Sequence, residues 1–164
     1  MRFLGSLTLS VCAAALLCAG SSTPRREDVP KYMKMLTSGI GKDRAKAAEM
    51  LGRRGAISRK DVEDAIEPLK KMLQNDKDSG ARSAAALALG AIAPTPDETV
   101  PLLIDALKDK SVDVKISAIS ALGLYGPAAK SAVTPLREIQ KDKTDKKMSQ
   151  AAGMALKSIF AKMK

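Results

Sequence analysis

Apolar residues recur three and four positions apart through most of the chain, the spacing that places them on one face of an α-helix. The clearest stretch is ARSAAALALG, residues 81–90, and near-copies of it occur at three other places. The segments around these copies are rich in alanine, leucine and methionine, which favour helix. The pattern therefore predicts one helix that recurs along the chain.

The recurrence has a fixed register, which can be counted from prolines that sit among apolar residues. In each of four units a proline stands 21 residues before a leucine, an alanine stands four residues before that leucine, and a glycine follows it in three units. The residues are Pro30, Ala47, Leu51 and Gly52; Pro68, Ala85, Leu89 and Gly90; Pro101, Ala118, Leu122 and Gly123; and Pro135, Ala152 and Leu156. The prolines are 38, 33 and 34 residues apart, a period typical of solenoids built from stacked helical units.

Each unit is expected to contain two antiparallel helices. The segments around the prolines predict first helices over 29–38, 59–74, 98–108 and 128–142, and the alanine-leucine segments predict the second helices. Short polar links join the two, which favours antiparallel packing. Glycine after the leucine predicts that the second helix ends there, with the glycine at or near its C-cap, and Pro68 predicts a kink in its first helix.

The expected fold is all-α: an α-solenoid of about four antiparallel helix pairs in a right-handed superhelical stack, covering residues 29–164. The units extend over about 29–55, 58–93, 96–126 and 127–162. In the fourth unit Lys157 replaces the glycine, Ser149 replaces a cation and Gly153 enters the helix. These departures are typical of a terminal capping unit.

Residues 1–20 have the features of a secretory signal peptide. Arg2 supplies positive charge, residues 7–19 form an apolar run of 13, and small residues precede Ser21. The run is too short for a membrane-spanning helix. We expect export to the periplasm or secretion, with residues 21–28 as a flexible linker. A lipid anchor at Cys18 and an uncleaved N-terminal anchor are the alternatives.

Composition narrows the chemistry available to the chain. Both cysteines, Cys12 and Cys18, lie in the expected signal, and the sequence contains no histidine and no tryptophan. Disulfides, thiolate metal sites and imidazole acid-base chemistry are therefore excluded from the mature chain. No glycine-rich phosphate loop or nucleophile elbow is present. We expect a protein that is not an enzyme and that needs no cofactor and no metal ion.

The formal net charge of +10 predicts attraction to anionic surfaces. Nucleic acid is nevertheless a disfavoured partner, because the aromatic residues that would stack on bases are almost absent. Outside the expected signal they are Tyr32, Tyr125 and Phe160.

The chain resembles the HEAT-repeat family, in particular its short-repeat bacterial members. The resemblance rests on ARSAAALALGAIA (81–93) and VKISAISALGLYG (114–126), each preceded by a helix-forming segment, 66–76 and 100–109, and it covers roughly residues 28–162. It implies a scaffold or adaptor, and in a few members an enzyme or an enzyme accessory. The iron-dependent hydroxylases of the family need histidine ligands, which this chain lacks.

The same resemblance implies that second helices line the concave face of the stack. Arg44, Arg82 and Lys115 stand seven residues before their repeat leucines, and Lys46 is close by. One interpretation is a cationic stripe that binds an acidic partner segment. The other, which we favour, is a structural ladder in which the cations pair between repeats with carboxylates such as those of Asp43, Asp78 and Asp113.

The sequence therefore favours a non-catalytic, extracytoplasmic HEAT-repeat scaffold or adaptor. Its expected partner is another protein or an anionic cell-envelope component, bound through the concave or end surface. The alternatives are nucleic-acid binding along the basic concave stripe, and service as an accessory subunit of an enzyme.

Overall fold

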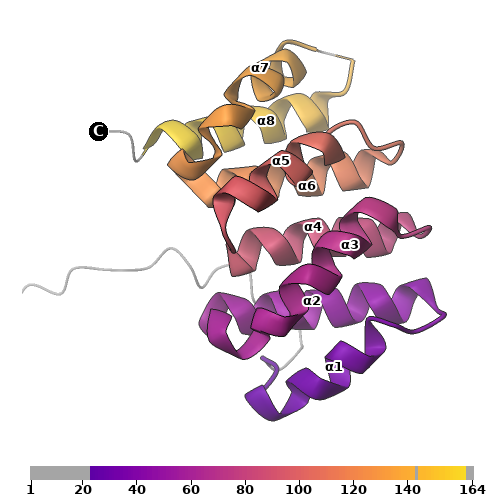
Figure 1. The fold of residues 1–164 in the computed structure, drawn as a ribbon. Coiled ribbons are helices and arrows are strands. Elements are labelled where there is room, and N and C mark those ends of the chain that lie inside the picture. Colours follow the sequence, from indigo (N-terminus) through magenta and orange to yellow (C-terminus); the bar gives the residue numbers. More distant parts are fainter. Residues whose placement is uncertain (1–22, 143, 162–164) are drawn as a thin grey trace, which may run out of the picture.

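The computed structural model describes residues 23–142 and 144–161, which form an α-solenoid of two layers (Figure 1). The first helices of the units are α1 (Val29–Met35), α3 (Ile66–Asn75), α5 (Pro96–Ala106) and α7 (Val133–Lys141). The second helices are α2 (Gly41–Ile57), α4 (Ser79–Ile92), α6 (Val112–Tyr125) and α8 (Lys146–Ala161). Three short 3-10 helices, η1 (Arg26–Asp28), η2 (Arg59–Ala65) and η3 (Gly126–Ala132), complete the described structure. The expected signal peptide and Cys18 lie outside the described residues.

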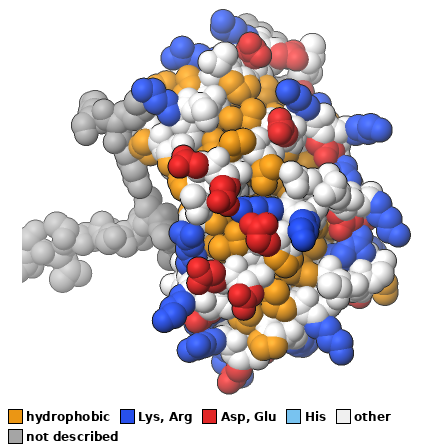
Figure 2. Space-filling view, in the orientation of Figure 1, with side chains coloured by type: hydrophobic (Ala, Val, Ile, Leu, Met, Phe, Trp, Pro, Cys, Tyr) orange, Lys and Arg blue, Asp and Glu red, His pale blue; other side chains and the backbone are white. Residues whose placement is uncertain are grey.

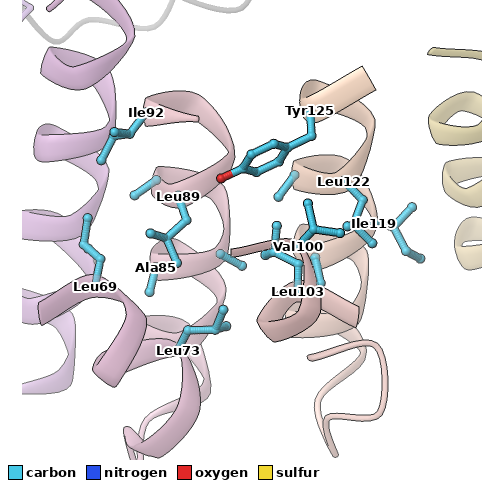
Figure 3. Packing of buried hydrophobic residues seen from close by; sticks show 14 of the residues in the cluster. Leu69, Leu73, Ala85, Leu89, Ile92, Val100, Leu103, Ile119, Leu122 and Tyr125 are labelled. Atoms are coloured by element: carbon cyan, nitrogen blue, oxygen red, sulfur yellow. The ribbon is translucent and has the colours of Figure 1, made fainter. Parts of the chain in front are cut away.

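The alanines and leucines that define the repeat all point into the core. Every one of these alanines is fully buried, as are the leucines of the first three units, and Leu156 is nearly so. Figure 3 shows Leu89 of α4 and Leu122 of α6 among the side chains that fill the space between layers, with Tyr125 between the two helices. The Tyr125 hydroxyl donates a hydrogen bond to the carbonyl of Pro94, 3.3 Å away. The repeat period thus fixes the buried face of each second helix.

None of the three repeat glycines is itself a C-cap. Gly90 and Gly123 lie near the ends of α4 and α6, as expected, whereas Gly52 lies well inside α2. Each faces an alanine of the next second helix at close approach of the two backbones, which leaves no room for a side chain at Gly52 and Gly90 and little room at Gly123. A Cβ atom added to the glycine would lie 2.8, 2.7 or 3.2 Å from the alanine Cα in the three pairs, Gly52 with Ala88, Gly90 with Ala121 and Gly123 with Ala155. These contacts join consecutive units.

The glycine-alanine contact also explains the fourth unit. Lys157 occupies the glycine position of α8, and its side chain is exposed because no further helix packs there among the described residues. At the other end of the stack, Met50 occupies the alanine position of α2, which contacts no second helix of a preceding unit within the described residues. Both larger residues thus lie at the two ends of the stack that the structure describes.

The two layers differ in how closely neighbouring units approach. Consecutive second helices contact one another over many residues, whereas consecutive first helices touch over far fewer. The layer with the shorter spacing lies on the inside of any curve that the stack follows. We call the outward side of α2, α4, α6 and α8 the second-helix face.

Two of the expected first helices are each split in two. The predicted helix over 59–74 is η2 followed by α3, with a break at Val62, whose φ of −125° and ψ of 17° are not helical. Pro68 is the third residue of α3, so it begins a helix rather than kinking one. Proline lacks an N–H and clashes with the carbonyl four residues earlier, which disfavours an α-helix that continues through it. Pro135 holds the same position in α7, after η3.

Gly126 ends α6 with a φ of 57°, the conformation that favours glycine, and Pro127 follows in η3. This glycine-proline pair therefore marks the change from α6 to η3. None of the helices within the described residues combines the length and the apolar character needed to cross a membrane.

Candidate functional site

Arg44 ties the first unit to the second. Its guanidinium makes two hydrogen bonds of 2.6 Å to the carboxylate of Asp76, and its Nη1 donates to the carbonyl of Ser38 at 2.7 Å. Asp76 directly follows α3, so the pair bridges two units. Both side chains are mostly buried. The hydrogen bond from Arg44 holds the pKa of Asp76 below its ordinary value, against the opposing effect of burial.

Arg82 repeats this arrangement one unit later. Its Nε and Nη2 donate to the carboxylate of Asp109 at 2.7 and 2.9 Å, and its Nη1 donates to the carbonyl of Asp76 at 2.8 Å. Hydrogen bonding to Arg82 lowers the pKa of Asp109. Two-pronged arginine-carboxylate pairs combine strength with fixed geometry. Arg44, Asp76, Arg82 and Asp109 thus form a continuous ladder across three units.

The ladder uses different carboxylates from those expected. Asp43 accepts from the hydroxyl of Ser38, and Asp78 caps α4 by accepting from the backbone N–H of Ala81 at 2.9 Å. Asp113 makes no ion pair among the described residues, so none of the three expected aspartates pairs with an arginine of the ladder. We call each arginine-carboxylate pair of the ladder a rung. The rung carboxylates instead follow the first helix of the next unit, where they also accept backbone N–H groups of their own loop.

The two lysines that were grouped with these arginines lie outside the ladder. Lys115 is half-buried and makes no ion pair within the described residues, although Asp142 directly follows α7 as Asp76 follows α3. That carboxylate instead accepts from the N–H and hydroxyl of Thr144, at 2.9 and 2.7 Å. Lys46 is exposed and pairs with Glu49 at 3.3 Å. The structure therefore does not gather the four cations into one free stripe.

An exposed apolar surface on the second helices was missed in the sequence. Leu87 of α4, Leu124 of α6 and Met154 of α8 have exposed fractions of 44%, 62% and 66%. We call these three residues the second-helix patch. They stand two residues before or after the repeat leucine, where the first unit has Glu49 and Arg53. The loss of charge at these two positions after the first unit is the sequence signal that could have revealed the patch.

A shallow groove runs between α6 and α8 beside the patch. Its lining is made of small residues and two larger apolar ones: Ser120, Gly123, Leu124, Ala151, Met154, Ala155 and Ser158. The helices approach closely at the floor of this groove, where Gly123 faces Ala155. Leu124 and Met154 are the two large side chains in the lining, so the groove is apolar with a few hydroxyl groups.

The second helices from α4 to α8 contain few charged residues. Within α4, α6 and α8 there are five cationic residues and one acidic residue: Arg82, Lys115, Lys146, Lys147 and Lys157 against Asp113. Arg82 is the one member of this set that forms an ion pair among the described residues. Lys147 stands seven residues before Met154, and Asp113 stands seven residues before Ser120, so one cation and one anion share the outward face with the groove.

The side of the first helices is different in character. Figure 2 shows this side, with acidic and basic side chains interspersed among apolar ones. Lys70 is buried there and bridges α3 and α5, with its Nζ 2.7 Å from Glu67 and 2.5 Å from Glu98. Those two hydrogen bonds raise the pKa of Lys70. Lys70 thus links the first helices of the second and third units.

The described residues contain no cluster of three or more histidine, cysteine, aspartate or glutamate side chains arranged to hold a metal ion. Asp61, at the start of η2, is paired with Arg54, and that hydrogen bond lowers its pKa. A carboxylate held ionised in this way is poorly suited to donate a proton near neutral pH.

A stack of helix pairs with a shared core defines an α-solenoid repeat protein. The family described as HEAT repeats matches residues 29–98 and 93–157. The chain therefore belongs to the HEAT-repeat family.

Among solved structures, the chain is similar to the crystal structure of an engineered protein, with a TM-score of 0.63 and 27% sequence identity. The similarity covers 82% of this chain and 63% of the engineered one, so the chain spans less than two thirds of that protein's length. No match was found among curated proteins.

Proposed function

We propose that this protein is a non-catalytic scaffold that binds another protein through the second-helix patch. The observation that carries the proposal is the exposure of Leu87, Leu124 and Met154 on three consecutive units. Exposed apolar side chains grouped on one surface are typical of interaction sites, since leaving them in water is unfavourable. HEAT repeats commonly act as scaffolds for protein interactions, which agrees with this use of the surface.

The distribution of charge supports a protein partner over nucleic acid. A nucleic-acid site along the second helices would need a row of free cations to contact phosphates. Arg44 and Arg82 are already engaged by Asp76 and Asp109 between units. Breaking these pairs to contact phosphate would leave carboxylates buried without partners, which is costly.

We further propose that the scaffold works outside the cytoplasm. The support is the pattern of residues 1–20, a positive start, a short apolar run and small residues before Ser21. Intact mass of the protein recovered from the producing cell, combined with fractionation, tests this. Cleavage near Ser21 in an exported fraction is the expected result, and a lipid-modified Cys18 would place the scaffold on a membrane surface. A full-length cytoplasmic product would contradict export.

Site-specific photocrosslinking in the producing cell tests the binding surface. A photoreactive amino acid is placed at Met154 in the patch and, as a control, at the exposed Lys71 on α3. We expect a defined crosslinked product from position 154, lost when Leu124→Ser is added, and none from position 71. Equal products from both positions, or none from position 154, would contradict the proposed surface.

A further inference from the structure

We infer that Met154 is a redox-sensitive switch, at which oxidation to the sulfoxide by hydrogen peroxide turns off binding through the second-helix patch. This inference rests on the proposed function and adds a means of regulating the same surface. Three features carry it: the exposure of this thioether, its place beside Leu124 in the groove, and its small share in the core.

Methionine is the only residue type with an oxidisable sulfur in the part of the chain that the structure describes, because both cysteines, Cys12 and Cys18, precede that part. Met50 and Met72 have exposed fractions of 3% and 7%, whereas Met154 has 66%. The other described methionines, which are half-buried, are Met33, Met35 and Met148. Because the oxidant must reach the sulfur, Met154 should react before the others.

The oxidation needs one molecule of hydrogen peroxide and no other reactant. A lone pair of the thioether sulfur attacks one oxygen of the peroxide, so that the O–O bond breaks and a sulfur–oxygen bond forms. The transferred oxygen gives up its proton to the departing oxygen, which leaves as water. The sulfur is thereby oxidised by two electrons and the peroxide is reduced. Methionine sulfoxide reductases return the sulfoxide to the thioether, so the change is reversible.

The position of Met154 links this reaction to binding. Its side chain and that of Leu124 are the two large apolar members of the groove between α6 and α8. A sulfoxide is polar, so a partner that covers it must remove water from the new oxygen. Of the two serine hydroxyls in the lining, that of Ser120 already donates to the carbonyl of Ile116 at 2.9 Å. Oxidation therefore disfavours contact with the patch.

The fold itself should tolerate the sulfoxide at this position. Met154 lies two residues before the buried Leu156 of α8, and its mostly exposed side chain contributes little to the core. Water can therefore hydrate the sulfoxide oxygen in the free protein. Oxidation of Met50 or Met72 would instead place that oxygen among buried apolar side chains, which reduces stability. A reaction confined to Met154 thus changes binding and leaves the stack intact.

Peroxide treatment of the full chain, followed by peptide mass spectrometry, tests the selectivity. We expect the sulfoxide to form at Met154 at least about tenfold faster than at Met50 and Met72, and faster than at the half-buried methionines. Thermal unfolding of the chain oxidised at Met154 should give an unchanged melting temperature. Equal rates at Met50 and Met154, or a lower melting temperature after oxidation of Met154 alone, would contradict the inference.

Crosslinking tests the effect on binding. The purified full chain carries a photoreactive amino acid in place of Leu87, which leaves Met154 unchanged, and is irradiated in an extract of the producing cell. Brief peroxide treatment, with the peroxide then removed by catalase, should reduce the crosslinked product at least about fivefold, and a methionine sulfoxide reductase should restore it. Met154→Gln, which places a permanent polar amide in the groove, should give the reduced yield without peroxide.

Two further variants locate the effect. In Met154→Leu, which has an apolar side chain without sulfur, the yield should be the same before and after peroxide treatment. Ile40→Gln, at a similarly exposed apolar residue in the loop before α2, should leave the yield unchanged.

The outcomes separate the inference from the proposed function. An undiminished product from the chain oxidised at Met154, or an equal loss in Met154→Leu after peroxide, would overturn the switch while the proposed function stands. If the untreated chain gives no product from position 87, the proposed function fails, and the switch fails with it.

Discussion

The interfaces between the first three units differ from the interface between the third and fourth. Arg44 and Arg82 each span a boundary with two-pronged pairs, whereas Lys115 at the third boundary makes no ion pair within the described residues. The glycine-alanine approach is also tightest at Gly90 and looser at Gly123, where an added Cβ would lie 3.2 Å from the Ala155 Cα. The last unit is therefore held to the third mainly by apolar packing, with fewer specific contacts than join the first three units.

This difference coincides with the candidate site. The groove that exposes Leu124 and Met154 lies between α6 and α8, at the boundary that lacks the arginine rung. Binding surfaces are often drawn from the less stable parts of a structure, where adaptation to a partner is easier. We therefore expect the two tight boundaries to maintain the stack and the looser boundary to provide the surface that binds a partner.

Substitution of the repeat glycines by alanine should give the largest difference in stability between the boundaries. A Cβ at Gly90 would lie 2.7 Å from the backbone of Ala121, so Gly90→Ala should reduce the free energy of unfolding by about 2 to 3 kcal/mol. Gly123→Ala should change it by less than about 1 kcal/mol, because the contact is looser and alanine favours helix. Urea unfolding measures both. Gly39→Ala, with open space around it, is the control. Similar losses at residues 90 and 123 would remove the distinction between the boundaries.

Removing the cation from a rung is expected to have the next largest effect. Arg82→Ala leaves the carboxylate of Asp109 without its main partner in a mostly buried setting, and should cost about 2 kcal/mol of unfolding free energy. Lys115→Ala, at the equivalent position of the next unit, should cost no more than about 0.5 kcal/mol. Chemical denaturation of the two variants gives the comparison. Equal losses would show that the ladder does not distinguish the boundaries.

Acid should weaken the first two boundaries selectively. The folded-state pKa values of Asp76 and Asp109 are lowered by their arginines from an ordinary value of 3.8. Their contribution to stability is therefore complete above about pH 4 and is lost as the pH falls through the lowered pKa values. We expect a smaller acid-induced loss of unfolding free energy between pH 5 and pH 2 in the double variant Asp76→Asn, Asp109→Asn. An unchanged acid dependence in that variant would contradict the role of these pairs.

Completing the third rung should have the smallest effect. Lys115→Arg places a guanidinium at the position equivalent to Arg82, within reach of the loop that carries Asp142. Because Asp142 is exposed, the gain in unfolding free energy should be about 0.5 kcal/mol. Thermal unfolding of Lys115→Arg and Lys115→Gln compares a new rung with a lost charge. A lower melting temperature for the arginine variant would show that the fourth unit cannot accept the rung.

The fold could be predicted from the sequence because the buried face of a helix depends on spacing along one segment. Ala85 and Leu89, four residues apart, face the same way whatever surrounds them. Contacts between units are not encoded in this local manner. Gly90 resembles a helix end in the sequence, and its true neighbour, Ala121, is 31 residues away. For the same reason Asp109 could not be predicted as the partner of Arg82, since the two residues are far apart in the sequence.

The candidate surface was harder to predict for a different reason. Outward positions of a repeat are free to vary between units, so Leu87, Leu124 and Met154 do not stand out as a repeated motif. The cations, in contrast, form a visible pattern in the sequence because they recur at a fixed position of the repeat. That recurrence reflects structure, since Arg44 and Arg82 bridge neighbouring units. The groups available for recognition lie where the repeat is least regular.

Hydrogen exchange of the full chain tests most directly whether the fourth unit is held more loosely than the first three. In the free chain the amides of α8 should exchange faster than those of α4, because the fourth unit has fewer fixed contacts. Exchange in α8 that is as slow as in α4, or slower, would contradict the account.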